Sequence, residues 1–336
     1  MKTMPKIIPV ASGKGGVGKT FLTANLAIAL AEAGHSTIVV DMDLGGSNLH
    51  SFLGLPNRFP GIGDFLKARS AELEELLVKT VIPNLRFIPG DGLSPFLANI
   101  PYAQKIRLIS KVKKLPAEYI LLDLGAGTSF NTIDFFRISR YGLVVTKPEY
   151  PSIMNMLGFL KHFVLRLIER TFAGDQRIRD LLLTLYKQPI TEQRNNISAL
   201  GSKIATIDQA AGKRVEALCR DFRPRIIFNM GEHPDEIEIS RKIDSGLENS
   251  LSLKVDYFGF IFDDPHVRRS IKKQVPFLPE YRESMAGKGI AQTAERVAKF
   301  LEVPVKESAM LLLKRIRQDY ENRKDPATWS EVQNAG

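Results

Sequence analysis

The residues with the clearest chemical potential lie between positions 13 and 20, where the sequence reads GKGGVGKT. This string fits the spacing G-x-x-x-x-G-K-[ST], in which glycines let successive backbone N–H groups point into one concavity around a polyphosphate. Lys19 can reach the outer phosphates, and the Thr20 hydroxyl can bind Mg²⁺. A glycine-rich turn that arose by chance is the alternative, but the flanking residues argue against it. The string predicts a nucleoside triphosphate site.

Two elements must hold this loop in place. Residues 6–10 form a short apolar run, broken only by Pro9, that predicts a buried strand. The apolar spacing after the loop predicts a helix over residues 19–33, which ends near Gly34. The positive N-terminal end of that helix would point at the bound phosphates. Strand, glycine loop and helix therefore follow one another in the order that a phosphate-binding loop needs.

Two more predicted strands deliver carboxylates. Residues 37–40 run into Asp41 and Asp43, and residues 119–122 run into Asp123. Side chains that directly follow buried parallel strands lie at the C-terminal edge of the sheet, where α/β ligand sites form. Four apolar residues followed by an acid, after a phosphate loop, predict that Asp123 holds Mg²⁺, and the glycines behind it predict a mobile loop that senses the γ-phosphate. A solvated acidic loop is the alternative for residues 41–48.

The loop also carries a second lysine, Lys14. With it, the string KGGVGKT resembles the deviant Walker A motif of the MinD/ParA family of P-loop ATPases, and the later motifs are closest to its MinD and FlhG-like branch. The resemblance implies a three-layer, doubly wound, mostly parallel sheet. It also implies an ATP-sandwiched homodimer, in which Lys14 reaches the nucleotide held by the other subunit. A solvated loop lysine is the alternative.

The resemblance covers residues 6 to 300 and assigns roles to single residues. The pattern DxD-x-G-x-x-N is similar to the family's first switch region, which implies that Asp43 activates the attacking water, with Asn48 close by and Asp41 in the outer shell of the metal. Asn229, delivered by a predicted strand over residues 225–228, would hydrogen-bond the adenine edge. ATP is therefore expected rather than GTP, since no NKxD motif is present. Gly125 departs from the family, which usually has proline there.

Together these inferences give the predicted site. The nucleotide-binding residues are Gly13, Lys14, Gly15, Gly16, Val17, Gly18, Lys19, Thr20 and Asn229; the catalytic residues are Lys14, Lys19, Asp43 and Asp123; and the metal-binding residues are Thr20, Asp43 and Asp123. The implied cofactors are ATP and Mg²⁺.

Composition narrows the class of protein. The chain has 336 residues, one cysteine and a formal net charge of +10. One cysteine excludes a disulfide framework and a CxxC metal site. The start is too short and too polar for a signal peptide, and no apolar run reaches the ~18 residues that span a bilayer. The sequence thus predicts a cytoplasmic protein, and the charge favours an anionic partner, either DNA or the inner face of a membrane.

The predicted ATPase domain, residues 1–303, contains a helical insertion over about residues 152–224. About seventy residues separate two predicted strands there, although a parallel crossover needs only about a dozen. Four apolar stripes at helical spacing predict four helices, with basic residues spread among them. Two interpretations remain open: a helical insert that packs on the sheet with solvated basic faces, or an elaboration that binds a partner or DNA.

Residues 304–336 are predicted to form a C-terminal helix and a polar tail. Apolar residues from Val305 to Tyr320 follow helical spacing beside Lys314, Arg315 and Arg317. A basic amphipathic helix of this kind can lie on an anionic membrane. Acidic residues dilute its positive face, however, which favours a helix docked on the protein's own body.

The resemblance implies a Mg²⁺-dependent ATPase that works as an ATP-driven dimerisation switch in spatial organisation. The candidate roles are placement of the division site or flagellum and partitioning of chromosomes, plasmids or other cargo, with a protein activator. A ParA-like ATPase that binds DNA non-specifically and a nucleotide-locked interaction scaffold are alternatives. A metal-cluster carrier of the Mrp type is disfavoured by the single Cys219, and a cobyrinate-amidating synthetase by the lack of a visible glutaminase domain.

Overall fold

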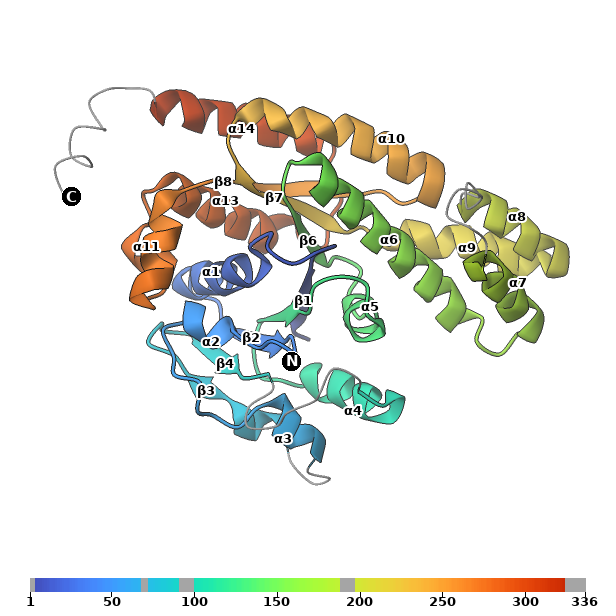
Figure 1. Ribbon diagram of the computed structural model, residues 1–336, viewed down its shortest axis with the longest axis horizontal. Helices are drawn as coiled ribbons and strands as arrows, with labels where there is room; N and C mark the ends of the chain where they lie inside the picture. Colours follow the sequence, from blue (N-terminus) through green and yellow to red (C-terminus); the bar gives the residue numbers. More distant parts are fainter. Residues whose placement is uncertain (1–3, 68–71, 91–99, 188–196, 324–336) are drawn as a thin grey trace.

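The computed structural model describes residues 4–67, 72–90, 100–187 and 197–323, and its framework is an eight-stranded sheet (Figure 1). Neighbouring strands follow the order β3-β4-β2-β5-β1-β6-β7-β8, and every pair is parallel except β3 with β4. The strands are β1 (Lys6–Ala11), β2 (Thr37–Met42), β3 (Val78–Lys79), β4 (Leu85–Ile88), β5 (Tyr119–Leu124), β6 (Leu143–Thr146), β7 (Arg225–Gly231) and β8 (Asp256–Phe262). The doubly wound, mostly parallel fold predicted from the sequence is confirmed.

Three strands extend further than their apolar runs. β2, β5 and β7 continue through Asp41, Asp123 and Asn229, which the sequence placed after the strands. The predicted strand ends were therefore wrong, because the parallel ladder continues wherever a neighbouring strand offers partners, whatever the polarity of the side chains. Asp41 and Asp123 are register partners on β2 and β5, so two carboxylates lie side by side inside the sheet.

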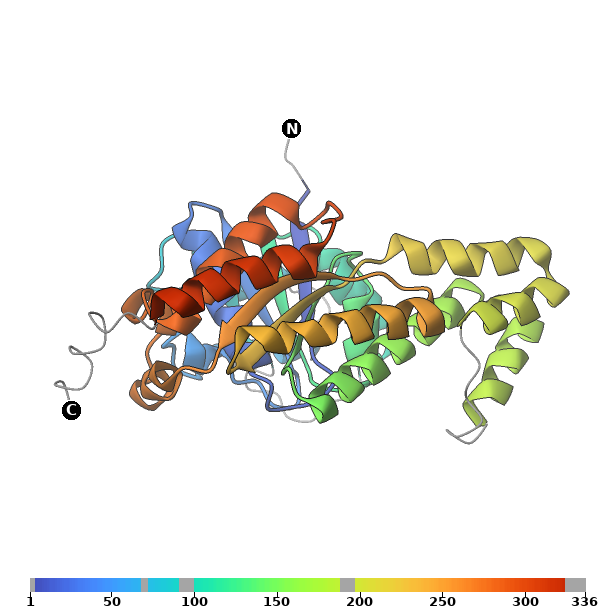
Figure 2. The same ribbon diagram turned by 90° about the horizontal axis from the view of Figure 1, so that it is seen from above.

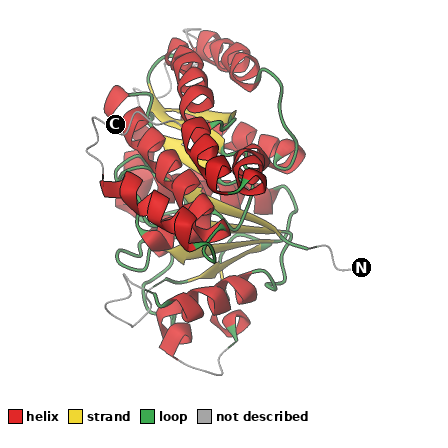
Figure 3. Cartoon of the chain, turned by 90° about the vertical axis from the view of Figure 1, so that its right-hand side faces the viewer, coloured by secondary structure: helices red, strands yellow, loops and turns green. Residues whose placement is uncertain are grey.

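Helices cover both faces of the sheet (Figure 3). One face is covered by α1, α2, α12 and α13, whose apolar side chains form one continuous core with the strands. The elements on this side, with the neighbouring α11, are α1 (Lys19–Glu32), α2 (Leu49–Phe52), α11 (Pro265–Lys273), α12 (Phe277–Glu280) and α13 (Met285–Phe300). Asn25 connects α1 to α12, because its buried side chain accepts a hydrogen bond from the Leu278 backbone at 3.0 Å.

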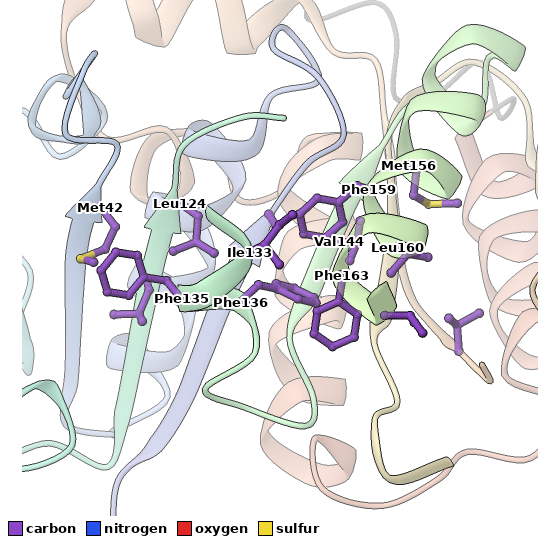
Figure 4. Packing of buried hydrophobic residues seen from close by; sticks show 14 of the residues in the cluster. Met42, Leu124, Ile133, Phe135, Phe136, Val144, Met156, Phe159, Leu160 and Phe163 are labelled. Carbon is purple, nitrogen blue, oxygen red and sulfur yellow. The ribbon is translucent and has the colours of Figure 1, made fainter. Parts of the chain in front are cut away.

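The second core lies on the opposite face. Its helices are α3 (Ile62–Lys67), α4 (Tyr102–Val112), α5 (Phe130–Phe136), α6 (Tyr150–Thr171), α10 (Ser240–Leu251) and α14 (Ser308–Arg323), with two short 3₁₀ helices, η1 (Leu73–Leu76) and η2 (Pro234–Ile239). Figure 4 shows the layer between α5, α6 and the strands. There the Phe136 ring makes edge contacts with Phe159 and Phe163, at centroid distances of 5.1 and 5.2 Å.

The predicted insertion is helical, but only its first helix packs on the sheet. α6 contacts β6 and α5. The next three helices are α7 (Gln176–Lys187), α8 (Ile197–Ile207) and α9 (Gln209–Asp221). They pack on one another, on α6 and on α10, and they project beyond the end of the sheet (Figure 2). Of the two open interpretations, a helical insert packed on the sheet therefore describes α6, whereas α7–α9 form a projecting arm.

The C-terminal helix α14 docks on the protein body, the arrangement that its acidic residues favoured. It packs on β8 and η2 through buried Leu312 and Ile316. Arg317 pairs with Asp235 of η2 at 2.6 Å, and Tyr320 stacks on the Phe262 ring. The predicted polar tail lies outside the described residues from position 324 onward. Among the helices that the structure describes, none combines the length and the apolar character needed to cross a membrane.

Candidate nucleotide-binding site

The glycine loop joins β1, near the middle of the sheet, to α1. Gly18 occupies the N-cap position of α1 and has no side chain that could cap the helix. The first backbone N–H groups of α1 are therefore open to an anionic ligand, and the helix dipole favours one. Gly15 and Gly16 are exposed at the top of the loop, whereas Lys19 is buried beneath it. This is the phosphate cradle that the sequence predicts.

Two glycines in the loop are required by their neighbours. Gly18 has a φ of 77°, and a Cβ there would lie 2.2 Å from the Asn229 amide nitrogen. A Cβ on Gly13 would lie 2.3 Å from the backbone of Asn155 in α6. Any other residue at either position would displace the loop or its support. The loop thus packs against β7 on one side and against the first turns of α6 on the other.

Asp123 meets the phosphate loop from β5. The Lys19 ammonium group donates to Asp123 Oδ1 at 2.8 Å, and the Thr23 hydroxyl donates to the same oxygen at 2.9 Å. The other oxygen, Oδ2, is buried and has no hydrogen-bond partner in the described part of the chain. Buried polar atoms are normally paired, so an unpaired carboxylate oxygen beside a phosphate loop points to a missing cation or a water bound to one.

Asp41 organises the loop that follows β2. Its Oδ2 accepts hydrogen bonds from the Ser47 hydroxyl at 2.6 Å and the Leu49 backbone at 3.1 Å, and its Oδ1 accepts from the Asp43 backbone at 3.1 Å. Burial, together with the nearby Asp123 carboxylate, raises the pKa of Asp41 to about 7. Both oxygens are occupied by the loop, so Asp41 is a positioning residue for Asp43.

Asp43 lies where two loops approach each other. It is half-buried, and a Cβ on Gly125 would lie 3.4 Å from its carboxylate. The loop after β5 therefore lies beside the Asp43 carboxylate, with room for a Cβ at ordinary van der Waals distance. The Gly125 carbonyl accepts a hydrogen bond from Thr132 at 3.2 Å, and the Gly127 backbone donates to the Ser12 carbonyl at 2.9 Å. These bonds tie the loop after β5 to α5 and to the phosphate loop.

Asn229 braces the phosphate loop. Its side-chain amide donates to the Val17 carbonyl at 2.8 Å, a contact that the sequence did not predict. The next residue, Met230, has a φ of 57° at a register irregularity between β7 and β8. A cavity of about 380 Å³ runs from the phosphate loop and Asp43 past Met230 to Val267 and Ile271 of α11. Its apolar end suits an aromatic base, and its size is within the range of ligand sites.

The structure brings the predicted residues together around one cavity, except Gly13, which is not among the lining residues and lies against Asn155 of α6. Lys14, the whole of Gly15–Thr20, Asp43 and Asn229 line the cavity, and Asp123 lies beneath it in contact with Lys19. Lys14 is only half-buried, and the structure shows no ion pair for it within the described ranges. Sequence reasoning missed Thr23 and Ser12. Thr23 follows Lys19 by one helical turn, which is the signal that would have placed its hydroxyl beside Asp123.

The donor set fits Mg²⁺. The Lys19 ammonium group lies 3.3 Å from the Thr20 hydroxyl and 2.8 Å from Asp123 Oδ1, so a hydroxyl and a carboxylate oxygen both lie next to the same lysine. In the described part of the chain no three His, Cys, Asp or Glu side chains gather as a protein-only metal site. Mg²⁺ is usually bound by one or two carboxylates with substrate phosphates, so these residues suit a metal that arrives with its nucleotide.

Comparison with known proteins agrees with this geometry. Residues 8–277 match the model of the CobQ/CobB/MinD/ParA nucleotide binding domain. The chain is 33% identical over 164 residues to the septum site-determining protein MinD of Thermotoga maritima, an alignment that covers 48% of this chain and 60% of that protein. It is 34% identical over 158 residues to the flagellum site-determining protein YlxH of Helicobacter pylori, covering 46% and 53%. The chain thus spans little more than half the length of these curated relatives.

One solved structure extends the similarity over nearly the whole fold. MinD of Pyrococcus horikoshii, complexed with Mg-ADP, superposes with a TM-score of 0.55 over 90% of this chain and 100% of that one, at 21% sequence identity. At this identity the likeness is one of fold. It supports the assignment of the sheet and its flanking helices.

Proposed function

The chain belongs to the CobQ/CobB/MinD/ParA family of nucleotide-binding domains, and from this premise we propose that it is a Mg²⁺-dependent ATPase that acts as an ATP-driven dimerisation switch. The observation that carries the proposal is the buried Lys19–Asp123 pair beneath the glycine loop, with Asp123 Oδ2 unpaired. A lysine that can move from a carboxylate to a phosphate, and a carboxylate free to bind a hydrated cation, are the parts that nucleotide hydrolysis needs.

Each proposed catalytic residue has a distinct task. The Lys19 ammonium group exchanges its contact with Asp123 for the outer phosphates, where it neutralises developing charge. Thr20 and Asp123 would hold Mg²⁺, which would supply electrostatic stabilisation of the phosphate oxygens. Asp43 orients the attacking water from the loop that Asp41 fixes. Positioning and electrostatics therefore do most of the work.

The proposed switch depends on Lys14. This lysine lines the cavity and directly precedes the exposed Gly15 and Gly16. In the proposed dimer its ammonium group would contact the nucleotide of a second copy of the chain. ATP would then join two subunits, and hydrolysis would separate them.

We propose that the switch serves spatial organisation, because the relatives include septum and flagellum site-determining proteins. A net charge of +10 supports an anionic target, either a membrane or DNA. The outer face of α14 exposes Met310 and Leu311 beside Lys314, which suits a lipid surface. Sedimentation with anionic liposomes in ATP, set against binding to duplex DNA, separates a membrane-cycling protein from a ParA-like one.

A metal-cluster carrier fits less well. Cys219 is the single cysteine of the chain and is fully buried. Burial raises the pKa of its thiol to about 12. A cluster needs thiolate ligands, and this thiol is both inaccessible and hard to ionise.

The proposal is tested with Asp43→Ala. This variant should bind ATP with the affinity of the parent protein, dimerise with it, and lose turnover by about a hundredfold or more. ATP binding is measured with a fluorescent analogue, dimerisation by light scattering, and turnover by phosphate release. Asp180→Ala, an exposed carboxylate on the projecting arm, is the control. Turnover of Asp43→Ala at the parent rate would refute the role of Asp43.

Lys14→Ala tests the switch separately from hydrolysis. It should bind ATP and remain monomeric in light scattering, whereas Lys288→Ala, which removes an exposed lysine on α13, should dimerise normally. An ATP-dependent dimer of Lys14→Ala would exclude a contact from Lys14 to the other subunit's nucleotide.

A further inference from the structure

A second charged cluster lies away from the nucleotide, where α4, α5 and α6 meet. Asp134 of α5 is buried there, and four cations surround its carboxylate; we call these the basic cluster. Lys105 of α4 approaches it at 2.7 Å, Arg166 at 3.0 Å, Arg170 at 3.6 Å and Arg137 at 3.7 Å. Burial opposes ionisation of Asp134, but hydrogen bonds from Arg166 and Lys105 outweigh it and lower its pKa to about 2. One carboxylate thus faces four positive charges.

The cluster has more donors than acceptors. Glu169 accepts a hydrogen bond from Arg166 at 2.9 Å, so two carboxylates, Asp134 and Glu169, face four cations. The Nε atoms of Arg137 and Arg170 are buried and have no hydrogen-bond partner in the described residues. Burial lowers the pKa of Arg137, and the charges of Arg170 and Arg166 add to this effect while Asp134 opposes it. Both Nε atoms are closed to solvent, and that of Arg137 lies 3.7 Å from Asp134, so an outside anion would meet the exposed remainder of these guanidinium groups and their surplus positive charge.

Aromatic side chains surround this cluster at the surface. The Arg166 guanidinium lies 4.6 Å from the Phe130 ring centroid, and Arg170 lies 4.4 Å from that of Tyr102. Phe130 is 68% exposed and Tyr102 is 55% exposed. Ile106, one helical turn after Tyr102, is 45% exposed. Large apolar side chains with this exposure, beside half-buried guanidinium groups, are typical of an interaction site rather than of a solvated surface.

We propose that this surface binds an acidic segment of a protein partner. A carboxylate of the partner would accept hydrogen bonds from Arg137 and Arg170, whose side chains are each about a quarter exposed. An adjacent apolar side chain would pack on Phe130 and Tyr102. A guanidinium group matches carboxylate geometry, and the exposed rings favour a peptide over a free inorganic anion, which would leave them in water.

The site lies outside the nucleotide cavity but close to the loop that faces Asp43. Asp134 lies on α5, and Arg137 is the C-cap residue of that helix. Phe130 is its first residue and directly follows the loop formed by residues 125–129. The apolar layer beneath α5 holds the helix on the sheet through Ile133, Phe135 and Phe136 (Figure 4). A partner bound on α5 would therefore contact the helix that positions the loop facing Asp43. The binding proposal does not require ATP hydrolysis, so it can fail or succeed independently of the proposed function.

The test uses the full chain with Mg-ADP and two probes, poly-L-glutamate and a random glutamate–tyrosine copolymer. The copolymer should bind more tightly than poly-L-glutamate. Arg137→Gln should weaken binding of both probes about tenfold, the loss expected for one charged hydrogen bond. Arg241→Gln removes an equal charge from an exposed position on α10 and should leave both affinities unchanged.

Phe130→Ala separates the aromatic contribution. It should abolish the preference for the copolymer and leave poly-L-glutamate binding unaltered, whereas Val81→Ala, at another exposed apolar residue, should change neither. Arg137→Lys keeps the charge and should bind both probes within about threefold of the parent affinity. This result would show that the weaker binding of Arg137→Gln comes from the lost charge and not from misfolding. Equal losses for Arg137→Gln and Arg241→Gln would overturn the proposal. A duplex DNA whose binding depends on Arg137 more strongly than the copolymer's does would overturn it too.

Discussion

Asp123 and Asp134 are both buried aspartates, one on β5 and the other on the next helix, and their surroundings are opposite. Asp123 has one cation, Lys19, and an oxygen without a donor. Asp134 has four cations around it, and two of these keep an N–H without an acceptor. The first site is short of positive charge, and the second has too much of it.

This difference indicates which kind of ligand each site can bind. An unpaired buried atom costs free energy that a ligand of the right sign recovers. An unpaired carboxylate oxygen therefore indicates a cation, here Mg²⁺ with its nucleotide. Four cations around one carboxylate indicate an anion, here a carboxylate of a partner that would meet the exposed parts of Arg137 and Arg170. Each of the following predictions tests one side of this contrast.

The largest expected effect is on folding stability at Asp134. Asp134→Asn leaves four cations around a neutral amide and should lower the free energy of unfolding by about 3–5 kcal/mol, as measured by urea denaturation. Asp235→Asn also breaks an Asp–Arg pair, but at an exposed position, and should cost far less. If both variants lose the same stability, the basic cluster is an ordinary surface network.

Asp123→Asn should act on turnover rather than on stability. The amide oxygen can still accept from Lys19 and Thr23, and the change removes repulsion of Asp41, so unfolding should alter little. Phosphate release should nevertheless fall about a hundredfold, because the carboxylate that would hold the metal is lost. Asp244→Asn, on α10, is the control. Parent turnover in Asp123→Asn would show that the unpaired oxygen has no catalytic use.

The two sites should also respond to pH in opposite directions. Burial and Asp123 raise the pKa of Asp41 from 3.8 to about 7, so its contribution to stability is complete below about pH 4 and is lost as pH rises through 7. Asp134, with a pKa of about 2, contributes above about pH 4 and loses its contribution only as pH falls toward 2.

Urea denaturation between pH 5 and 8 measures the Asp41 contribution. The free energy of unfolding should decline with a slope of at most about 1.4 kcal/mol per pH unit, and Asp41→Asn should flatten the decline. Asp134→Asn should lower stability at every pH in this range without changing the slope. An unchanged slope in Asp41→Asn would assign the decline to another group.

The smallest expected effect is at Arg137. Arg137→Gln should change the free energy of unfolding by no more than about 0.5 kcal/mol, because Arg137 makes no hydrogen bond to Asp134 and its attraction to that carboxylate is offset by burial and by repulsion from Arg170 and Arg166. Arg166→Gln removes hydrogen bonds to Asp134 and Glu169 and should cost about 2 kcal/mol. An equal loss of stability in the two variants would mean that Arg137 stabilises the fold and is not available for a partner.

The sequence by itself determined the features that depend on neighbouring residues. The phosphate loop is contiguous, so spacing alone identified Gly13–Thr20. Apolar periodicity is set by the geometry of a single helix or strand, which is why the insertion and the C-terminal helix were predicted from residues within each element. The docking of α14 followed from its diluted positive face, a property of that one helix.

Tertiary structure alone decided which elements meet and at what register. Asn229 reaches the Val17 carbonyl from a strand far along the chain, and Asp41 lies beside Asp123 because β2 and β5 are neighbours. The basic cluster requires α4, α5 and α6 to meet over one carboxylate. Such contacts depend on the order of strands and on packing between helices, and neither produces a periodic pattern in the sequence. The partner of each buried charge can therefore be identified only from the folded structure.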